Sequence, residues 1–291
     1  MRTPTTQSTP GWAPARLGRA IPLLGVALAL APFVWVAFAH AIEVWSTDSE
    51  FSYGFFILPT TLLLIWWRRA ALRRSLGPGA SVGLLVVIGA LAVYLLAYRV
   101  GINALMGLAV VPLLWGCAVY LWGWGAGRVL AFPIGFLAFG LGLYRGLLYS
   151  VGFALQQVTV LGASTLGQAV GLSVERDGLV LHTEQLRFVV AEPCSGMNSL
   201  LSLLALGALW TYVAQGSLSA RLAVILSVLP IVVLANSTRV TLVLLVASWF
   251  GEETALGYFH GASSLTVFAL ALAGLVLISR MVGCKTPKLA T

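Results

Sequence analysis

Residues 222–250, LAVILSVLPIVVLANSTRVTLVLLVASWF, decide how the chain is threaded through a membrane. The run is apolar except for the polar group NSTR, residues 236–239, near its middle. A membrane-spanning helix needs about 20 apolar residues, so this run could form either one long helix or two short spans. The positions of the charged residues distinguish the two, because cytoplasmic loops of membrane proteins are enriched in Lys and Arg.

The composition of the 291 residues is that of a membrane protein. Hydrophobic residues make up 59% of the chain and charged residues 9%, whereas soluble domains carry about 25% charged residues. The mean hydropathy is +0.97. The net charge of +8 does not indicate nucleic-acid binding, because no basic stripe is interleaved with aromatic residues. Arginine-rich cytoplasmic loops account for it instead.

Seven further apolar runs are candidates for membrane spans. They are residues 21–42, 52–67, 81–98, 104–123, 129–144, 197–214 and 259–279. With a cytoplasmic N-terminus and one crossing by 222–250, one side carries twelve Lys and Arg residues and no acid. The other side carries five Arg and all nine acidic residues. Two crossings by 222–250 would break this segregation. The sequence therefore predicts an all-α polytopic membrane protein of about eight transmembrane helices, with both termini in the cytoplasm.

The first apolar run, Ile21 to Ala41, also has features of a signal peptide, since it follows two arginines and contains AFAHA. Its length of about 20 residues exceeds the usual 7–15 of a signal-peptide core, so we interpret it as a span. Residues 1–19, rich in Thr and Pro at their start, are expected to form a disordered cytoplasmic tail. Residues 20–284 then form a single membrane-embedded domain, followed by a short cytoplasmic tail, 285–291.

Residues 145–193 form a sizeable segment outside the predicted spans, on the outer side. The first part, GLLYSVGFALQQVTVLGASTLGQAVG, mixes apolar and polar residues and indicates an interfacial helix, broken near Gly162. The second part, LSVERDGLVLHTEQLRFVVAE, alternates apolar and polar residues around Asp177-Gly178, which is typical of a β-hairpin. The predicted fold therefore includes a small outer insert made of a helix and a hairpin.

The three cysteines fall in different places. Cys117 lies in the fourth predicted span, Cys284 in the cytoplasmic tail and Cys194, within AEPCSGMNSL, on the outer side. This topology leaves Cys194 without a partner for an intramolecular disulfide. A lone thiol outside the cytoplasm is either a small buried hydrophobe or a nucleophile. Cys194 by itself leaves both interpretations open.

Two more polar residues are predicted at the depth of Cys194. Arg239 lies 18 residues beyond Arg221, which is about 27 Å along a helix and therefore near the outer edge of the hydrocarbon core. His260 begins the last span from the same side. A thiol, an imidazole and a guanidinium are the groups that acyl transfer through a thioester requires. The alternative is that Arg239 snorkels to the interface and His260 caps its span.

The segments AEPCSGMNSL, ANSTRV and FHG resemble, in this order, three signatures of the exosortase/archaeosortase family. These are a Cys-Ser-Gly box, an Asn-x-x-Arg box and a late His-Gly. The resemblance covers roughly residues 40–280, is specific over 187–262, and extends to the Pro-containing AFPIGFLAF at 131–139. It implies a sortase-like cysteine transpeptidase or protease. In this interpretation Cys194 matches the family's nucleophile, Arg239 its essential arginine and His260 its histidine.

The resemblance also implies partners and a location. Family members act on secreted proteins that end in a sorting signal: a short motif (Pro-Glu-Pro in the bacterial form), an apolar helix and a basic tail. The expected partners are such proteins, membrane lipid and extracellular polysaccharide machinery. The expected location is the plasma (inner) membrane, with the active site on the outer face. Asn198 and Tyr53 stand where many members have arginine and histidine, which leaves the subfamily and its motif open.

Other polar residues on the outer side are assigned lesser roles. Four lie in or beside the boxes and are candidates for substrate binding: Glu192, Ser195, Asn198 and Asn236. His182 is expected to be an exposed residue of the hairpin. His40 and Glu43 are expected to form an interfacial cap rather than a catalytic pair. No CxxC, HExxH or Gly-rich phosphate loop occurs, so neither a metal site nor a cofactor is expected.

Two other classes of function remain open. One is a membrane lipid acyltransferase, or a plain intramembrane protease, that uses the same cysteine. The other is a transporter or assembly factor of an envelope polysaccharide system. A transporter requires polar residues near the bilayer midplane and paired broken helices. Here the polar groups are predicted at one edge, which favours chemistry at the outer edge over transport.

Overall fold

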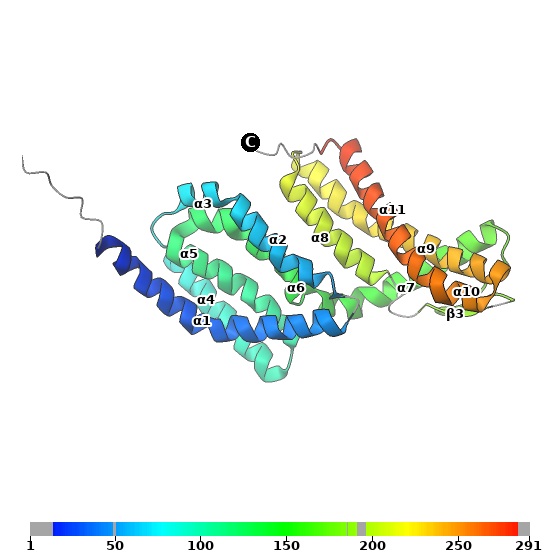
Figure 1. The fold of residues 1–291 in the computed structure, drawn as a ribbon, viewed down its shortest axis with the longest axis horizontal. Coiled ribbons are helices and arrows are strands. Elements are labelled where there is room, and N and C mark those ends of the chain that lie inside the picture. The colour runs from blue at the N-terminus through cyan, green and yellow to red at the C-terminus, as the bar shows by residue number, and fades with distance from the viewer. Residues whose placement is uncertain (1–13, 49–50, 185, 191–195, 285–291) are drawn as a thin grey trace, which may run out of the picture.

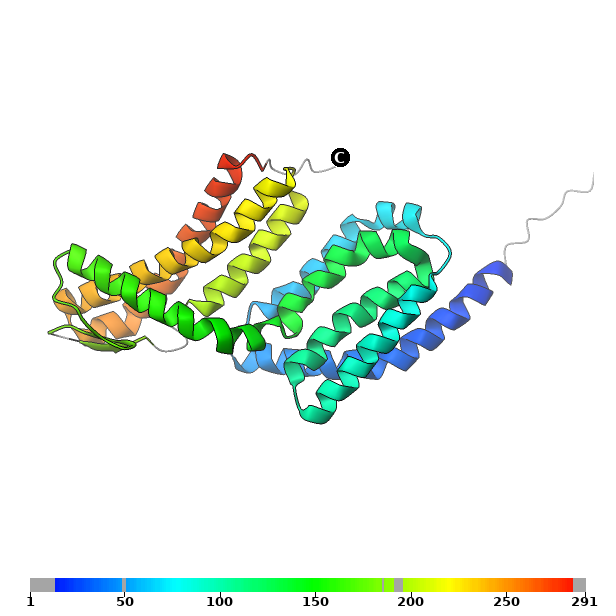
Figure 2. The ribbon, with the colours of Figure 1, turned by 180° about the vertical axis from the view of Figure 1, so that it is seen from behind.

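The computed structural model of the chain describes residues 14–48, 51–184, 186–190 and 196–284. Its helices form two groups that lie side by side, and a long helix links them across one end (Figures 1 and 2). The N-terminal group contains α1 (Pro14–Thr47), α2 (Gly54–Trp67), α3 (Arg69–Ser75), α4 (Ser81–Val100), α5 (Asn103–Phe136) and α6 (Ala138–Leu141). The linking helix is α7 (Leu143–Ala169). The C-terminal group contains α8 (Met197–Val213), α9 (Leu218–Phe250), α10 (Glu252–Thr254), the π-helical turn η3 (Ala255–Phe259) and α11 (His260–Met281).

Several of these helices are long and apolar enough to cross a membrane. Among the described residues, five segments meet both requirements: Leu28–Thr47, Ser81–Val100, Asn103–Leu141, Leu218–Phe250 and Ala262–Met281. α2 and α3 meet at 60° and form a sixth if they are taken together, and α8 is a shorter apolar helix. Each of the eight predicted ranges contains a helix, although fewer segments have the full length of a span. The predicted all-α polytopic membrane fold is confirmed.

The segment Asn103–Leu141 holds two of the predicted spans because α5 reverses at Gly123. This glycine has φ 80° and ψ 179°, which is not helical. The indole Nε1 of Trp115 donates a 2.9 Å hydrogen bond to the carbonyl oxygen of Gly127. On a straight helix these two residues would lie about 18 Å apart, so the chain must turn back between them. The predicted ranges 104–123 and 129–144 therefore match the two arms of one helical hairpin.

Residues 222–250 lie within a single helix, α9, as the charge distribution predicted. Ser217 caps its start, since the Ser217 hydroxyl accepts a 3.2 Å hydrogen bond from the Ala220 amide. The helix has 33 residues and is therefore about 50 Å long, more than a hydrocarbon core of about 30 Å requires. From Val240 onward α9 packs into a second core together with α7 and a small sheet.

The small sheet is antiparallel and has the order β1-β2-β3. Its strands are β1 (Glu175–Asp177), β2 (Val180–His182) and β3 (Arg187–Val189). Asp177 pairs with Val180 across the turn, and Gly178 in that turn has φ 59°, a conformation that favours glycine. The hairpin predicted at Asp177-Gly178 is confirmed, and β3 adds a third strand. The core beneath the sheet is made by these buried residues: Val160, Ala163, Leu181, Phe188, Val243, Leu244 and Ala247.

The predicted break of the interfacial helix near Gly162 is wrong. α7 runs from Leu143 to Ala169 and crosses the end of the C-terminal group (Figure 2). Gly162 serves close packing instead, because a Cβ atom at this position would overlap the Ser237 hydroxyl on α9. Small residues let two helix backbones approach closely, which explains why the helix continues through this glycine.

The first helix also begins earlier than expected. α1 starts at Pro14, so residues 14–19, which the sequence assigned to a disordered tail, are helical. Proline is favourable at the first position of a helix, where its missing N–H has no partner to lose. The rest of the predicted tails, residues 1–13 and 285–291, lies outside the described residues.

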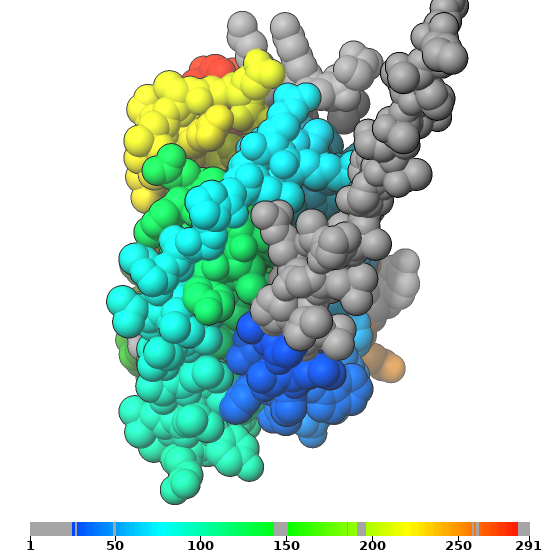
Figure 3. All heavy atoms as spheres, turned by 90° about the vertical axis from the view of Figure 1, so that its left-hand side faces the viewer, coloured from blue at the N-terminus to red at the C-terminus, as the bar shows by residue number. Residues whose placement is uncertain are grey.

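Charged residues separate toward opposite ends of the helices. α3, the turn between α8 and α9 and the last residues of α11 lie at one end, called here the α3 end (Figures 1 and 3). Basic residues at this end include Arg69, Arg73, Arg74, Arg221 and Arg280. α10 and the sheet lie at the opposite, α10 end (Figure 1), with the acidic residues Glu175, Asp177, Glu252 and Glu253. This is the segregation along the helix axes that the sequence predicted.

Candidate active site

A cavity of about 800 Å³ lies between the two groups of helices. Its walls come from α2 and the turn before it, from α5, and from α8, α9 and α11. The lining residues are Ser52, Tyr53, Phe56, Ile57, Thr60, Phe136, Gly196, Asn198, Ser199, Ser202, Ala205, Leu206, Leu209, Arg239, Ser264, Leu265 and Phe268. Among these described residues Arg239 is the only one that carries a charge.

The cavity changes from polar to apolar along α8. Asn198, Ser202, Ala205 and Leu209 are spaced by three or four residues and so share one face of this helix. The polar members stand where α8 begins, and the apolar members follow. An adjoining cavity of about 180 Å³ continues in the same direction between α8 and α11. Its lining is Leu206, Leu209, Trp210, Val213, Leu272, Leu275 and Val276. The site therefore has a polar head and an apolar extension.

Gly196 of the Cys-Ser-Gly box lines the cavity beside its polar head and caps α8. Its φ of 85° is left-handed, and a Cβ atom here would lie 3.1 Å from Nδ2 of Asn236. Both the backbone angle and the crowding favour glycine. The predicted nucleophile Cys194 and the candidate binding residues Glu192 and Ser195 lie just before it, outside the described residues.

Arg239 of the Asn-x-x-Arg box is half-buried on α9 and lines the cavity opposite the start of α8. It also borders a small adjoining cavity of about 30 Å³, whose polar lining includes Ser199, Asn236 and Ser264. Val240, the next residue, already belongs to the core under the sheet. Arg239 therefore lies between the cavity and the core under the sheet.

Asn236 and Asn198, both predicted to bind substrate, have different surroundings. Asn198 is exposed in the large cavity, where its Oδ1 accepts a 3.3 Å hydrogen bond from the Ser202 hydroxyl. Asn236 is 4% exposed and does not line the large cavity. Its Nδ2 donates a 3.2 Å hydrogen bond to Oγ1 of Thr159 on α7. Asn236 is therefore packed between helices rather than presented to a ligand in this cavity.

The polar contact between α7 and α9 was missed by sequence reasoning. Further hydrogen bonds join α7 and α9 in addition to the one from Asn236. The Ser237 hydroxyl donates to the Thr159 carbonyl oxygen at 3.4 Å, and the Thr241 hydroxyl donates to the Ala163 carbonyl oxygen at 3.2 Å. The signal was present as Thr159, Gly162 and Ala163, small or hydroxyl residues at helical spacing. Such spacing is typical of a close interface between membrane helices.

His260 is the first residue of α11 and follows the π-helical turn η3. Inside η3, Gly257 has φ −77° and ψ −113°, which interrupts the helical conformation before α11 begins. The His260 side chain lies outside the described part of the structure. Ser264, one turn later on the same helix face, lines the large cavity. Arg239 thus lines the same cavity as Gly196, two residues after Cys194, and Ser264, four residues after His260.

Tyr53 contributes to the opposite wall of the cavity. Its hydroxyl donates a 3.2 Å hydrogen bond to the Phe139 carbonyl oxygen. This bond ties the start of α2 to α6 and fixes the ring at the cavity wall.

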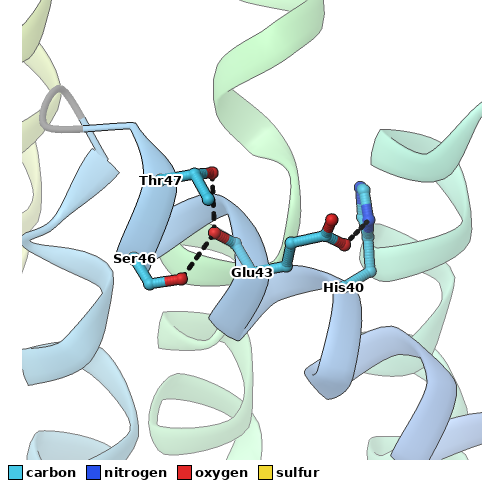
Figure 4. A network of polar contacts seen from close by, with 4 residues as sticks. All are labelled: His40, Glu43, Ser46 and Thr47. Atoms are coloured by element: carbon cyan, nitrogen blue, oxygen red, sulfur yellow. Dashed lines mark hydrogen bonds and ion pairs between the residues drawn. The ribbon is translucent and has the colours of Figure 1, made fainter.

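The histidines outside the boxes lie away from the cavity. Nδ1 of His40 lies 3.6 Å from Oε2 of Glu43, with side chains 27% and 69% exposed (Figure 4). The hydroxyls of Ser46 and Thr47 each donate to the Glu43 carbonyl oxygen at 2.8 Å. This surface pair agrees with the expected cap. His182 lies on β2 as predicted but is half-buried, because the sheet packs on α7.

Both described cysteines are at least partly buried. Cys117 is half-buried in α5. Cys284, expected in a cytoplasmic tail, is 2% exposed, and a Cβ atom at Gly216 would lie 2.9 Å from its Sγ. The end of α11 therefore folds onto the turn between α8 and α9. Within the described residues no three His, Cys, Asp or Glu side chains gather as a metal site would require.

The chain was compared with protein families, curated proteins and solved structures. Comparisons with curated proteins and with solved structures gave no significant match. The family described as "Transmembrane exosortase (Exosortase_EpsH)" matches residues 45–277. This range includes Cys194, Arg239, His260 and the whole cavity lining. The chain therefore belongs to the transmembrane exosortase family.

Proposed function

We propose that the protein is a membrane-embedded cysteine transpeptidase or protease. It cleaves C-terminal sorting signals of secreted proteins at the outer face of the plasma membrane, through a thioester on Cys194. The observation that carries this proposal is the cavity bordered by Gly196, Arg239 and Ser264. Cys194 is two residues from Gly196, a separation of at most about 7 Å for an extended chain. Its thiol is therefore within reach of the polar head.

The chemistry assigns one step to each group. The Cys194 thiolate attacks the scissile carbonyl carbon, and the C–N bond breaks as the thioester forms. His260 takes the thiol proton and delivers it to the leaving amine. Arg239 donates hydrogen bonds to the oxyanion, since a guanidinium has five N–H donors and no acceptor. Water, an amine or a lipid head group then attacks the thioester, the C–S bond breaks and the proton released by the attacking group restores the thiol.

The shape of the cavity supports a substrate with a polar segment followed by an apolar helix. The polar head would take the sorting motif. The extension lined by Leu206, Leu209 and Leu272 would take apolar side chains of the helix that follows it. A basic tail would then stay at the cytoplasmic face, the side to which we assign the α3 end and both termini. The length of the substrate helix would set which peptide bond reaches Cys194.

Expression of the protein with a secreted protein from the same genome tests this function. That protein should end in a short motif, an apolar helix and arginines, and mass spectrometry should determine its mature C-terminus. We expect Cys194→Ala to leave the C-terminus uncleaved. Cys117→Ala, which removes a half-buried thiol from α5, is the matched control and should process normally. Normal cleavage by Cys194→Ala would exclude a thioester on Cys194. Absence of cleavage by the wild type as well would favour a transport or assembly role.

A further inference from the structure

We propose that Thr159 on α7 is a positioning residue for the active site. It anchors the Asn236 amide, which supports the Gly196 turn and so sets Cys194 relative to Arg239. The proposal rests on the function proposed above and adds a role for a helix that the sequence suggests only as an interfacial element.

The first step is the anchoring of Asn236. Thr159 is 0% exposed, and its Oγ1 accepts the 3.2 Å hydrogen bond from Nδ2 of Asn236. The Thr159 carbonyl oxygen also accepts from the neighbouring Ser237 hydroxyl at 3.4 Å. Buried polar groups are costly to leave without hydrogen bonds, so this pair of contacts favours one arrangement of α7 against α9.

The second step is the contact between Asn236 and the turn that follows Cys194. A Cβ atom at Gly196 would lie 3.1 Å from both Cγ and Nδ2 of Asn236. The amide therefore fills the space directly behind the Gly196 backbone. The Gly196 carbonyl oxygen accepts a 2.9 Å hydrogen bond from the Leu200 amide, the first turn of α8. Movement of Asn236 would therefore move the turn and the start of α8 together.

The third step links the turn to Arg239. Asn236 and Arg239 are three residues apart on α9, so they lie on the same side of one rigid helix. Thr159 thus helps to hold the Gly196 turn, which follows Cys194 by two residues, in one register with the helix that carries Arg239. A misplacement of about 1 Å between reacting groups can cost about a hundredfold in rate.

The test compares Thr159→Val, which keeps the shape but removes the acceptor, with Thr159→Ser, which restores a hydroxyl. Thr165→Val is the matched control, because Thr165 is an exposed residue of α7 whose hydroxyl donates to the Leu161 carbonyl of its own helix. The full chain is used in nanodiscs. We expect Thr159→Val to lower kcat for the co-encoded secreted protein about tenfold, with KM changed less than twofold. Thr159→Ser should recover most of kcat, and Thr165→Val should match the wild type.

Hydrogen–deuterium exchange provides a measurement that does not depend on catalysis. We expect the peptide containing Gly196 to Leu200 to exchange at least threefold faster in Thr159→Val than in Thr165→Val, at equal Tm. If the wild type cleaves no sorting signal, the proposed function fails while this comparison still tests the positioning. Unchanged exchange in Thr159→Val would overturn the inference. A loss of kcat in Thr159→Ser as large as that in Thr159→Val would also overturn the inference. Side-chain volume rather than the hydroxyl would then be responsible.

Discussion

The interfaces α4–α5 and α7–α9 both use glycine to bring helices together, but only the second adds hydrogen bonds between them. At Gly83 on α4 a Cβ atom would overlap the backbone of Tyr120 on α5. No side-chain hydrogen bond joins α4 and α5, which are described throughout. At Gly162 on α7 the overlap is with the Ser237 hydroxyl. Thr159 and Thr241 add bonds across that interface.

The two interfaces differ in the interactions that hold their helices together, and we infer that they differ in role as well. Van der Waals contact between closely packed backbones is sufficient to associate helices in lipid. Hydrogen bonds add direction, because they fix the rotation of one helix against its neighbour. The α4–α5 interface therefore stabilises the N-terminal group. The α7–α9 interface fixes the register of the helix that carries Asn236 and Arg239.

The largest expected effect concerns stability at the first interface. Gly83→Ala should reduce the yield of folded protein and lower its stability by more than about 3 kcal/mol, because backbone atoms cannot move away as a side chain can. Gly89→Ala on the same helix is the matched control, since no atom lies within 4 Å of a Cβ there. It should be neutral or stabilising by up to about 1 kcal/mol. Thermal unfolding in detergent measures both, and equal Tm values would contradict the packing role of Gly83.

A large effect on activity without loss of stability is expected on α9. Arg239→Lys keeps the charge but loses the planar array of donors, so cleavage should fall about 10²-fold. Arg221→Lys, at the α3 end of the same helix, is the control and should retain activity. If Arg239 only snorkels to the interface, its lysine variant will process substrate normally, since lysine snorkels equally well.

A smaller effect is expected at the contact between Gly162 and Ser237. Gly162→Ala should destabilise the protein by about 1–3 kcal/mol through overpacking. Combining it with Ser237→Ala should recover part of that loss, because the overlapping hydroxyl is removed. A double-mutant cycle on unfolding measures the coupling, expected at about 1 kcal/mol. Strict additivity would show that α7 relaxes away from α9 and that the interface does not fix their register.

The sequence alone determined the features that depend on solvent and on local geometry. Long apolar runs predicted the membrane helices, and the separation of basic from acidic residues predicted that 222–250 is one helix. Asp177-Gly178 predicted the hairpin, since its backbone requirements are local. The three boxes predicted which residues to expect at the site. Of these, Arg239 lines the large cavity together with Gly196 and Ser264, whereas the roles of Cys194, Arg239 and His260 stay a prediction.

The roles of residues whose contacts are distant in sequence could be seen only in the tertiary structure. Gly123 and Gly162 look alike in an apolar sequence, yet the first reverses α5 and the second lets α7 continue against α9. A glycine permits both a turn and a close approach, so the partner helix decides between them. The same holds for Thr159. Its hydroxyl acquires a role through Asn236, a residue 77 positions away, which no local pattern specifies.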